Sequence, residues 1–496
     1  MADAAPSIES TRGHRYTWVL GLLVFAGTLL RLGQLTHLLT GSNAFRQTQT
    51  AYVAWEYARK GINLMQTPLP IFGPNASVPM EFPLVQAAAA LLIRAGASPD
   101  LAMRTLGLIG FQATAVLLII TVRRWHGDLT AVIVAILFEF SPFGLVWGAA
   151  SLIDFPSVAL ALGMVLGLDT WFARGSYKGL LFGVTSAWLA FLVKATTVPS
   201  WCLLVIASAV VAIKLSRPLI RISVGLICGP VVGVLFAVAW THYADSVKNS
   251  DPLTDFLVST KQGFVNWNFG TIDQRLDWHS YSAIVNRVSS EIAGPSLLLV
   301  VIITAGIVLA TNSTQRILGS GWFFVAISAP LVFLNLYYIH DYYLIAVFPA
   351  VLVSAALGID VLLRQFSGRF ILPASVLISL GILWNSSSWY YVKEWREEQP
   401  VDATGSLLRA ATEPSDLIVM VGCDWNPQSL YYADRKGLMI RNLGASSNIW
   451  KVNDISDYRY VYRCDRTADI SAYLPSGYTV APTSALGLYR IVAPSR

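Results

Sequence analysis

A small set of ionisable side chains lies at the ends of apolar segments, where chemistry at a membrane surface would need them. Charged groups at membrane depth are costly, so they are usually paired or functional. If the apolar segments cross a membrane alternately, these residues all lie at its outer edge, and we expect them to share a pocket. The set consists of Arg46, Glu56, Glu81, Asp154, Lys194, His242 and the pair His340 and Asp341.

Several of these side chains also have a purely structural interpretation. Lys194 ends an apolar segment, where a lysine can extend its ammonium group to the interface. Asp154 and Glu81 each precede a predicted helix, so either carboxylate can accept from the free N–H groups of its first turn. Tyr342 and Tyr343 stand at the end of an apolar segment, as the tyrosines of an aromatic belt do. The residue types alone leave both interpretations open.

The composition predicts a polytopic α-helical membrane protein. Of 496 residues, 55% are hydrophobic and only 13% are charged, which is unusual for a large soluble protein. A run of about 20 apolar residues spans a bilayer. The sequence predicts about eleven such spans, at residues 17–36, 105–122, 129–149, 155–172, 178–196, 199–214, 221–241, 295–311, 320–339, 342–363 and 370–389.

Basic residues orient these spans, because short cytoplasmic loops are enriched in Lys and Arg. If the N-terminus is cytoplasmic, the cations fall on one side: Arg12, Arg15, Arg123, Arg124, Arg174, Lys178, Lys214, Arg217, Arg221, Arg316, Arg364 and Arg369. The net charge of +6 is then an orientation signal, and it implies no nucleic-acid partner. The segment 83–96 is too short to span and is expected as a half-inserted outer helix. A secretory signal peptide is the competing interpretation of residues 1–36, but ten further spans follow and no small-residue cleavage site is evident.

This topology predicts two domains. Residues 1–390 form a transmembrane domain with outer loops at 37–104 and 242–294, and residues 391–496 form a small periplasmic α/β domain with short strands such as DLIVMVG and YRYVYR. Cys423 and Cys464 both fall in the outer domain, so we expect a disulfide bond, with two independent thiols as the alternative. Glu139 lies near the middle of the third span, about 20 Å from Asp154. At that distance it takes no direct part in a site at the outer edge.

The order of four short motifs resembles the GT-C membrane glycosyltransferases, in particular their protein-mannosyltransferase and lipid A aminoarabinose-transferase branch. MEFP at 80–83, LIDFP at 152–156, FLVKATT at 191–197 and YYLIAVFPA at 342–350 occupy the positions of that branch's motifs. The resemblance covers roughly residues 15–390. Two departures stand out: Arg46 and Gln47 replace an acidic pair that serves as catalytic base, and Phe82 replaces a phosphate-binding lysine. The stretch NAFRQTQTA is similar to a less characterised GT-C subgroup.

The resemblance implies transfer of a sugar from a polyprenyl-phosphate donor to an acceptor hydroxyl outside the membrane, with inversion if the attack is direct. The leaving phosphate needs positive charge, which a guanidinium and an ammonium supply. The expected donor-phosphate residues are Arg46, Lys194, Gln47, Gln49, His340, Tyr342 and Tyr343. A carboxylate within about 3 Å of the attacking hydroxyl is the natural base. Asp154 is the first candidate for that base and Glu81 is the second.

Two further sets complete the expected site. The outer loop FVNWNFGTIDQRLDW offers indole faces and polar groups for an acceptor, or simply packs on the interface. Its candidate acceptor residues are Trp267, Asn268, Asp273, Arg275 and Trp278. No cofactor is required by the sequence, but a divalent metal ion is an alternative. Its candidate ligands are Glu81, Asp154, His340 and His242.

Other functions remain open at this stage. A transporter or flippase needs many spans too, although no internal repeat is evident in the sequence. A polymerase or ligase would take a whole lipid-linked glycan, and the missing acidic pair also fits an inactive relative. The expected partners are a polyprenyl-phosphate sugar, a glycan, lipid or protein acceptor, and membrane lipids. The expected location is the bacterial inner membrane, with the C-terminal domain in the periplasm.

Overall fold

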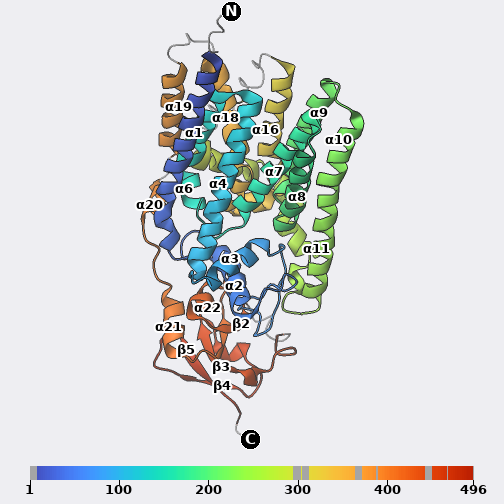
Figure 1. Ribbon diagram of the computed structural model, residues 1–496. Coiled ribbons are helices and arrows are strands. Elements are labelled where there is room, and N and C mark those ends of the chain that lie inside the picture. Colours follow the sequence, from blue (N-terminus) through green and yellow to red (C-terminus); the bar gives the residue numbers. More distant parts are fainter. Residues whose placement is uncertain are drawn as a thin grey trace, which may run out of the picture. The chain divides into compact units, whose positions relative to one another are not determined.

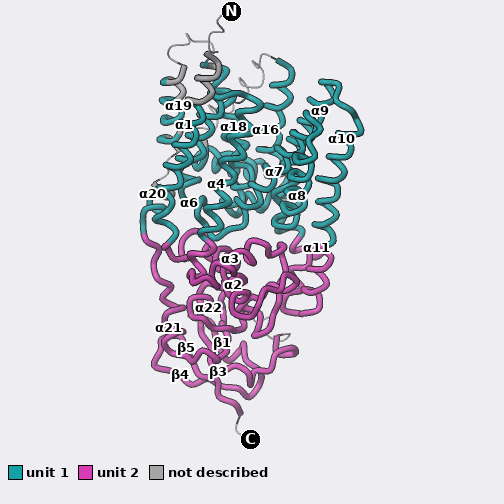
Figure 2. The backbone as a smooth tube through the Cα atoms, in the orientation of Figure 1, with its two compact units in different colours: residues 1–35, 104–239, 265–397 teal, residues 36–103, 240–264, 398–496 magenta. Residues whose placement is uncertain are grey.

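The chain divides into two compact units. Figure 1 shows the computed structural model, which describes residues 8–293, 303, 312–363, 371–386, 389–441, 449–465 and 467–494. Unit 1 comprises residues 1–35, 104–239 and 265–397, and unit 2 comprises residues 36–103, 240–264 and 398–496 (Figure 2). The sequence assigns the first outer loop to the membrane domain, whereas the structure packs that loop with the C-terminal domain.

Unit 1 is helical. Its helices are α1 (Ile8–Leu32), α4 (Pro99–His126), α5 (Asp128–Phe140), α6 (Pro142–Trp147), α7 (Asp154–Arg174), α8 (Tyr177–Val193), α9 (Val198–Lys214), α10 (Leu219–Leu226), α13 (Ile272–Leu276), α14 (Trp278–Val288), α16 (Ser313–Val332), α17 (Leu334–Ile339), α18 (Phe348–Leu363), α19 (Ile371–Ser386) and α20 (Trp389–Arg396). A π-helical turn, Ile227–Val231, joins α10 to α11 (Val232–Asn249), and α12 (Gln262–Phe269) begins in unit 2.

Four helical stretches among the described residues are long and apolar enough to cross a membrane. They are Tyr16–Thr36, Pro99–His126, Asp154–Arg174 and Leu219–Asn249. The count of eleven spans stays a prediction, because several predicted spans form shorter or interrupted helices. The predicted span 295–311 lies outside the described residues apart from residue 303, and so do Arg364 and Arg369.

Three predicted spans are interrupted rather than continuous. The span 129–149 breaks at Ser141, whose hydroxyl accepts from the N–H of Gly144 and so caps α6. Pro142 follows at the start of α6, where its missing N–H costs nothing. The span 320–339 breaks at Phe333, and the span 342–363 starts with a 3-10 segment, Asp341–Ala346, before α18. Hydropathy detects the apolar runs but not these local changes of direction.

A buried ion pair explains the charge that the sequence places in the third span. Arg31 of α1 and Glu139 of α5 are both fully buried, with 3.3 Å between Nη1 and Oε2. Arg31 also donates to the carbonyl oxygens of Glu139 and Gly144, which lie on either side of the break between α5 and α6. Gly27 lets the two helices approach, because a Cβ there would lie 2.0 Å from Oε2 of Glu139. The pair therefore joins α1 to the α5–α6 break.

Helices α7 and α8 form an antiparallel hairpin joined at Gly175 and Ser176. Gly167 of α7 faces Gly179 and Gly183 of α8, and a Cβ on Gly167 would lie 2.4 Å from the backbone nitrogen of Gly183; one turn earlier, Gly163 faces Ser186. Small residues spaced four apart let membrane helices pack with their backbones in contact. The hairpin brings the start of α7 next to the end of α8, which is where Asp154 and Lys194 lie.

Unit 2 contains a five-stranded sheet in the order β2-β1-β3-β5-β4. Its strands are β1 (Leu417–Val421), β2 (Lys436–Ile440), β3 (Tyr458–Arg463), β4 (Thr479–Pro482) and β5 (Leu488–Val492), with helices α21 (Ala403–Ala411) and α22 (Gln428–Ala433). Strands β2, β1 and β3 are parallel to one another. Strand β5 is antiparallel to both of its neighbours, β3 and β4. The predicted strands DLIVMVG and YRYVYR correspond to β1 and β3.

The first outer loop is an integral part of unit 2. It contributes α2 (Ala44–Lys60) and α3 (Leu84–Arg94), and its residues 70–73 pair with β2 through backbone hydrogen bonds to Gly437 and Met439. Glu56 of α2 is buried and accepts from Nζ of Lys60 at 2.6 Å, while Nζ of Lys436 in β2 lies 3.0 Å away. Burial alone would raise the pKa of Glu56, but the hydrogen bonds from these two ammonium groups outweigh it and hold the pKa below its ordinary value.

We expect the substitution Gly167→Ala to destabilise unit 1 by about 1–3 kcal/mol, because the new methyl group meets backbone atoms of α8 that have no room to move. Gly21→Ala is the matched control, since a Cβ at Gly21 meets open space. The midpoint of thermal unfolding in detergent should fall for the first variant and not for the second. Equal midpoints would show that the close approach of α7 and α8 is dispensable.

The lowered pKa of Glu56 predicts acid sensitivity. A carboxyl group with a lower pKa in the folded state stabilises the fold above its unfolded pKa, and that stabilisation is lost as the pH falls through the folded pKa. Lowering the pH from about 6 to about 3 should reduce the thermal midpoint less in Glu56→Gln than in the unsubstituted protein. Glu413→Gln, at an exposed position, serves as control. The same pH dependence in all three proteins would contradict this role for Glu56.

Candidate functional site

A buried ion pair joins two of the residues that the sequence predicts for the site. Lys194 Nζ lies 2.5 Å from Oδ1 of Asp154, and the two side chains are 3% and 1% exposed. Lys194 follows the last residue of α8 in an extended conformation, and Asp154 is the first residue of α7. Lys194 therefore does not reach the surface, and Asp154 accepts from an ammonium group while Ile153 stands at the N-cap of α7. The second carboxylate oxygen, Oδ2, is buried with no hydrogen-bond partner among the described residues.

Helix α4 positions the segment that carries Asp154. Gly107 and Gly110 leave room for this segment, because a Cβ on them would lie 2.2 Å from the carbonyl oxygen of Ala150 and 2.5 Å from Pro156. Arg104 donates to the carbonyl oxygen of Ala149 at 3.2 Å. The start of α7 is thus held by backbone contacts, and the carboxylate of Asp154 has a fixed place inside unit 1.

Aromatic side chains continue from Lys194 toward the surface of unit 1. Its Nζ lies 4.6 Å from the ring centre of Tyr343 and 5.4 Å from that of Tyr342, within the range of cation–π attraction. The tyrosine rings stack on each other at 4.6 Å, and His340 lies 5.4 Å from Tyr342. Trp267 lies 5.8 Å from His340. Unit 1 therefore brings together six predicted residues, from the buried Asp154 to the exposed Trp267.

The other predicted acceptor residues lie differently. Arg275 donates to the carbonyl oxygens of Leu331 and Val332 at the end of α16, so its guanidinium caps a helix. Trp278 is 77% exposed. The nearby apolar residues Ile272 and Leu276 are 77% and 81% exposed. Asp273 is exposed and Asn268 is half-buried. Of the predicted acceptor residues, Trp267 is the one whose ring contacts the cluster that contains Lys194.

The residues of the first outer loop form a second cluster, which belongs to unit 2. Arg46 of α2 forms an ion pair with Oε1 of Glu81, and its Nη1 donates to Oε1 of Gln49 at 2.7 Å. The guanidinium is buried, whereas the Glu81 side chain is 24% exposed. Gln47 donates to the carbonyl oxygen of Ser42, so it fixes the turn that precedes α2.

The segment that carries Glu81 is held by an aromatic contact. Phe82 meets Trp240 edge to face at 5.0 Å, and Nε1 of Trp240 donates to the carbonyl oxygen of Met80. Phe82 occupies the position of a phosphate-binding lysine in the family that the sequence resembles. In this chain it packs against the indole of Trp240. Glu81 lies two residues before Pro83, which is the N-cap of α3. Its carboxylate pairs with Arg46 and does not cap that helix.

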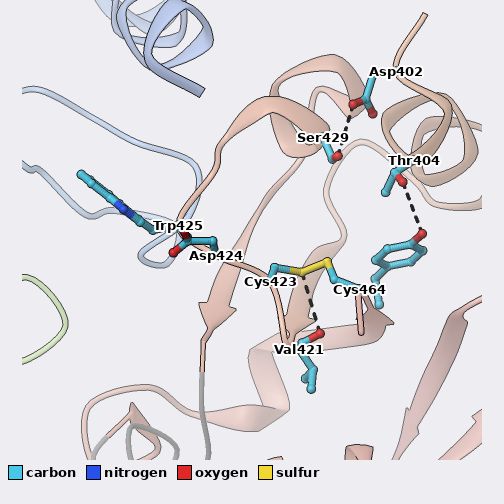
Figure 3. Close-up of a disulfide and its surroundings, with 9 residues drawn as sticks. Asp402, Thr404, Val421, Cys423, Asp424, Trp425, Ser429 and Cys464 are labelled. Carbon is cyan, nitrogen blue, oxygen red and sulfur yellow. Dashed lines mark hydrogen bonds between the residues drawn. A yellow bond between two sulfur atoms is a disulfide. The ribbon is translucent and has the colours of Figure 1, made fainter. Parts of the chain in front are cut away.

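The structure joins Cys423 and Cys464 in a disulfide bond, the pairing that the sequence predicts (Figure 3). Cys423 follows β1 and Cys464 follows β3, so the bond ties the carboxyl ends of two neighbouring parallel strands. Cys202 and Cys228 are free thiols.

The predicted metal ligands do not form a cluster. Among the described residues, no group of three or more His, Cys, Asp and Glu side chains is placed to hold a metal ion. His242 is exposed, and Asp154 is occupied by Lys194. The donor set therefore does not fit the divalent ion that the sequence leaves as an alternative.

Two aromatic residues near the buried pair were not predicted. Trp147, the last residue of α6, lies 6.3 Å from Tyr342, and Tyr337 of α17 lies 6.1 Å from Tyr343. Both are buried. Trp147 stands seven residues before Asp154 at the end of an apolar run, and this proximity in sequence is the signal that could have pointed to it.

No family model matches the chain, and no curated protein matches it by sequence. The fold, in contrast, is similar to solved structures over almost its whole length. The crystal structure of ArnT from Cupriavidus metallidurans bound to undecaprenyl phosphate matches with a TM-score of 0.63 at 12% identity, covering 97% of this chain and 98% of that chain.

Two larger transferases match as well. The archaeal oligosaccharyltransferase AglB from Archaeoglobus fulgidus, in complex with an inhibitory peptide and a dolichol-phosphate, matches with a TM-score of 0.56 at 11% identity, covering 91% of this chain and 69% of that chain. Arabinofuranosyltransferase AftD from Mycobacteria matches with a TM-score of 0.52 at 12% identity over 96% of this chain, which spans 40% of AftD. The predicted resemblance is confirmed in three dimensions: this chain has the fold of the GT-C glycosyltransferases.

Proposed function

We propose that the protein is a membrane glycosyltransferase that moves a sugar from a polyprenyl-phosphate donor to an acceptor hydroxyl at the outer face of the membrane. The observation that carries the proposal is the buried Lys194–Asp154 pair with the stacked Tyr342 and Tyr343 rings, in a fold shared with a transferase bound to undecaprenyl phosphate. The bacterial inner membrane, with the C-terminal domain in the periplasm, is the location that fits this activity.

The leaving group sets the chemical requirement. When the bond between the anomeric carbon and the phosphate oxygen breaks, negative charge grows on the phosphate, and a cation placed in advance lowers the barrier. Lys194 supplies that cation in unit 1, and the hydroxyl groups of Tyr342 and Tyr343 are donors for phosphate oxygens. In this proposal, His340 and Trp267 continue the cluster toward the sugar. Arg46 is a further cation of the same kind, held in unit 2 by Glu81.

The structure favours Glu81 over Asp154 as the general base. A base must reach the proton that it removes. Asp154 is buried and already accepts from Lys194, so it is suited to holding the ammonium group in place. Glu81 is partly exposed, although Arg46 pairs with one of its oxygens. Burial therefore supports Asp154 as the residue that positions Lys194 in unit 1, and we propose Glu81 separately as the base candidate of unit 2.

The activity itself is tested with purified protein in nanodiscs, a polyprenyl-phosphate monosaccharide and a crude cell-envelope glycan fraction as acceptor. Release of polyprenyl phosphate that depends on the acceptor is the expected result. Release only from a donor that carries a whole oligosaccharide would favour a glycan ligase instead. Movement of the intact donor between leaflets without cleavage would favour a flippase.

We expect Lys194→Ala to lower turnover about 10²- to 10³-fold, the usual effect of removing one group that stabilises developing charge. Lys178→Ala is the matched control, since Lys178 is exposed at the other end of α8. Adding Asp154→Asn to Lys194→Ala should lower turnover little further, because the carboxylate then has no ammonium group to position. Losses that multiply in the double variant would instead identify Asp154 as a base acting independently.

We expect Glu81→Gln to lower kcat by about 10²- to 10⁴-fold with little change in the KM for the donor, since a general base acts in the chemical step. The acidic limb of the pH–rate profile should disappear with it. Glu398→Gln, at an exposed position of unit 2, should behave like the unsubstituted enzyme. If Glu81→Gln keeps the acidic limb of the profile, Glu81 is not the base.

A further inference from the structure

The sheet of unit 2 has a topology in which ligands usually bind at one place. From β1 the chain goes through α22 to β2 on one side, and then crosses back to β3 on the other side of β1. In open α/β sheets, ligands bind outside the carboxyl ends of the strands where the order reverses in this way. Here that place lies between the loops that follow Val421 and Arg463.

The disulfide closes this place. Cys423 and Cys464 bridge the two loops with their Cα atoms 5.3 Å apart, and a Cβ on Gly422 would lie 2.9 Å from Cβ of Asp465. The same bond fixes the loop that continues from Cys423 into Asp424 and Trp425. Figure 3 shows the Trp425 indole pointing away from the disulfide. The loop therefore presents its side chains outward instead of enclosing a ligand over the strands.

Trp425 is the centre of an aromatic cluster within unit 2. Its ring lies 6.4 Å from Phe45, 6.5 Å from Phe72 and 6.2 Å from Phe256. Phe72 is buried, whereas Phe256 is 48% exposed and Trp425 and Phe45 are partly exposed. Three segments distant in sequence thus contribute accessible rings to one surface, and Phe45 directly precedes Arg46.

Polar groups beside Trp425 match a carbohydrate. The Asp424 carboxylate pairs with Arg441 at 3.4 Å, and the two side chains are 62% and 71% exposed. Asn426, on the other side of Trp425 in sequence, is exposed as well. A sugar presents an apolar C–H face together with hydroxyl groups that both donate and accept, so it needs rings bordered by such groups. A surface embedded in lipid would not place a carboxylate next to the ring, because its desolvation is costly.

We propose that Trp425, Phe45 and Phe256 form a binding platform for a pyranose-containing glycan acceptor, with Asp424, Asn426 and Arg441 contacting its hydroxyl groups. This inference rests on the proposed glycosyltransferase function and specifies the acceptor as a glycan rather than a protein or a free lipid. The disulfide holds Trp425 in position, so the platform depends on the oxidised state of Cys423 and Cys464.

Binding is tested without donor, using the full chain in nanodiscs and a mixture of gluco-, manno- and galactohexaose as probe. Saturation-transfer NMR should detect at least one hexaose. Trp425→Leu, which keeps an apolar side chain, should weaken binding about three- to tenfold. Trp425→Phe should retain most of the affinity, because it keeps a ring. Trp450→Phe is the control, since Trp450 packs on Tyr458 elsewhere in the sheet domain.

Three results would overturn the platform: no hexaose bound by the unsubstituted protein, equal affinity in Trp425→Leu, or stronger quenching of Trp425 than of Trp450 fluorescence by brominated lipids. The double variant Cys423→Ser with Cys464→Ser should lower the affinity as Trp425→Leu does, and unchanged affinity would refute the positioning role of the disulfide. The proposed function can fail separately. A protein that binds hexaose through Trp425 but never releases polyprenyl phosphate would support the platform and contradict the glycosyltransferase activity.

Discussion

The buried contact between Lys194 and Asp154 is the interaction on which the proposed chemistry depends. Neither charge would be tolerated alone in this place, because removing an ion from water costs several kcal/mol. Two helices packed through glycines on both sides hold the partners at 2.5 Å. The pairing gives the ammonium group a fixed place inside the bundle, which is what the proposed stabilisation of a leaving phosphate requires. Oδ2 of Asp154 is buried and has no hydrogen-bond partner within the part of the chain that the structure describes.

A second buried pair has the opposite character. Arg31 and Glu139 are as deeply buried, but every described contact of the guanidinium is to α1, to the α5–α6 break or to the ring of Phe111. Such a pair fixes the place where an apolar run changes direction. The break then orients α6, whose last residue, Trp147, contacts Tyr342. One ion pair thus supports the scaffold, and the other is the pair that we propose holds the donor phosphate.

The sequence predicted those features that depend on local pattern. Short apolar segments located the strands, although β4 and β5 fall in a single predicted segment, and the compartment argument paired Cys423 with Cys464. Apolar runs located most of the helices but missed the break at Ser141, since Pro142 and the serine cap act over one turn without lowering hydropathy. Arg31 was hidden inside the first apolar run, so the partner of Glu139 went unnoticed. The composition of unit 2 could not be predicted, because the pairing of residues 70–73 with β2 is a long-range contact.

The sequence predicted only part of the candidate site, because short motifs identify individual residues but not contacts between distant segments. Short motifs identified Asp154, Lys194 and the two tyrosines, and the structure places them together within unit 1. No local pattern distinguishes a base from a carboxylate that holds a lysine, so the roles proposed for Glu81 and Asp154 rest on their burial and ion pairs. Trp425 was missed because its partners Phe45, Phe72 and Phe256 come from distant segments, and isolated aromatic residues carry no signal in a chain with 16 Trp and 22 Phe.

The two aromatic surfaces considered for the acceptor differ in what surrounds them. Around Trp278, the apolar Ile272 and Leu276 are exposed together with the charged Asp273 and Asp277, and Arg275 donates to carbonyl groups at the end of α16. Such a surface is suited to the membrane interface, where an indole ring is stable beside aliphatic side chains. Around Trp425, the exposed neighbours are the ring of Phe256 and the polar groups of Asp424, Asn426 and Arg441. The polar groups beside Trp425 exchange water for hydroxyl groups when a sugar binds, and the rings of Phe45 and Phe256 extend its apolar face, so rings and polar groups together favour Trp425 as the proposed glycan contact.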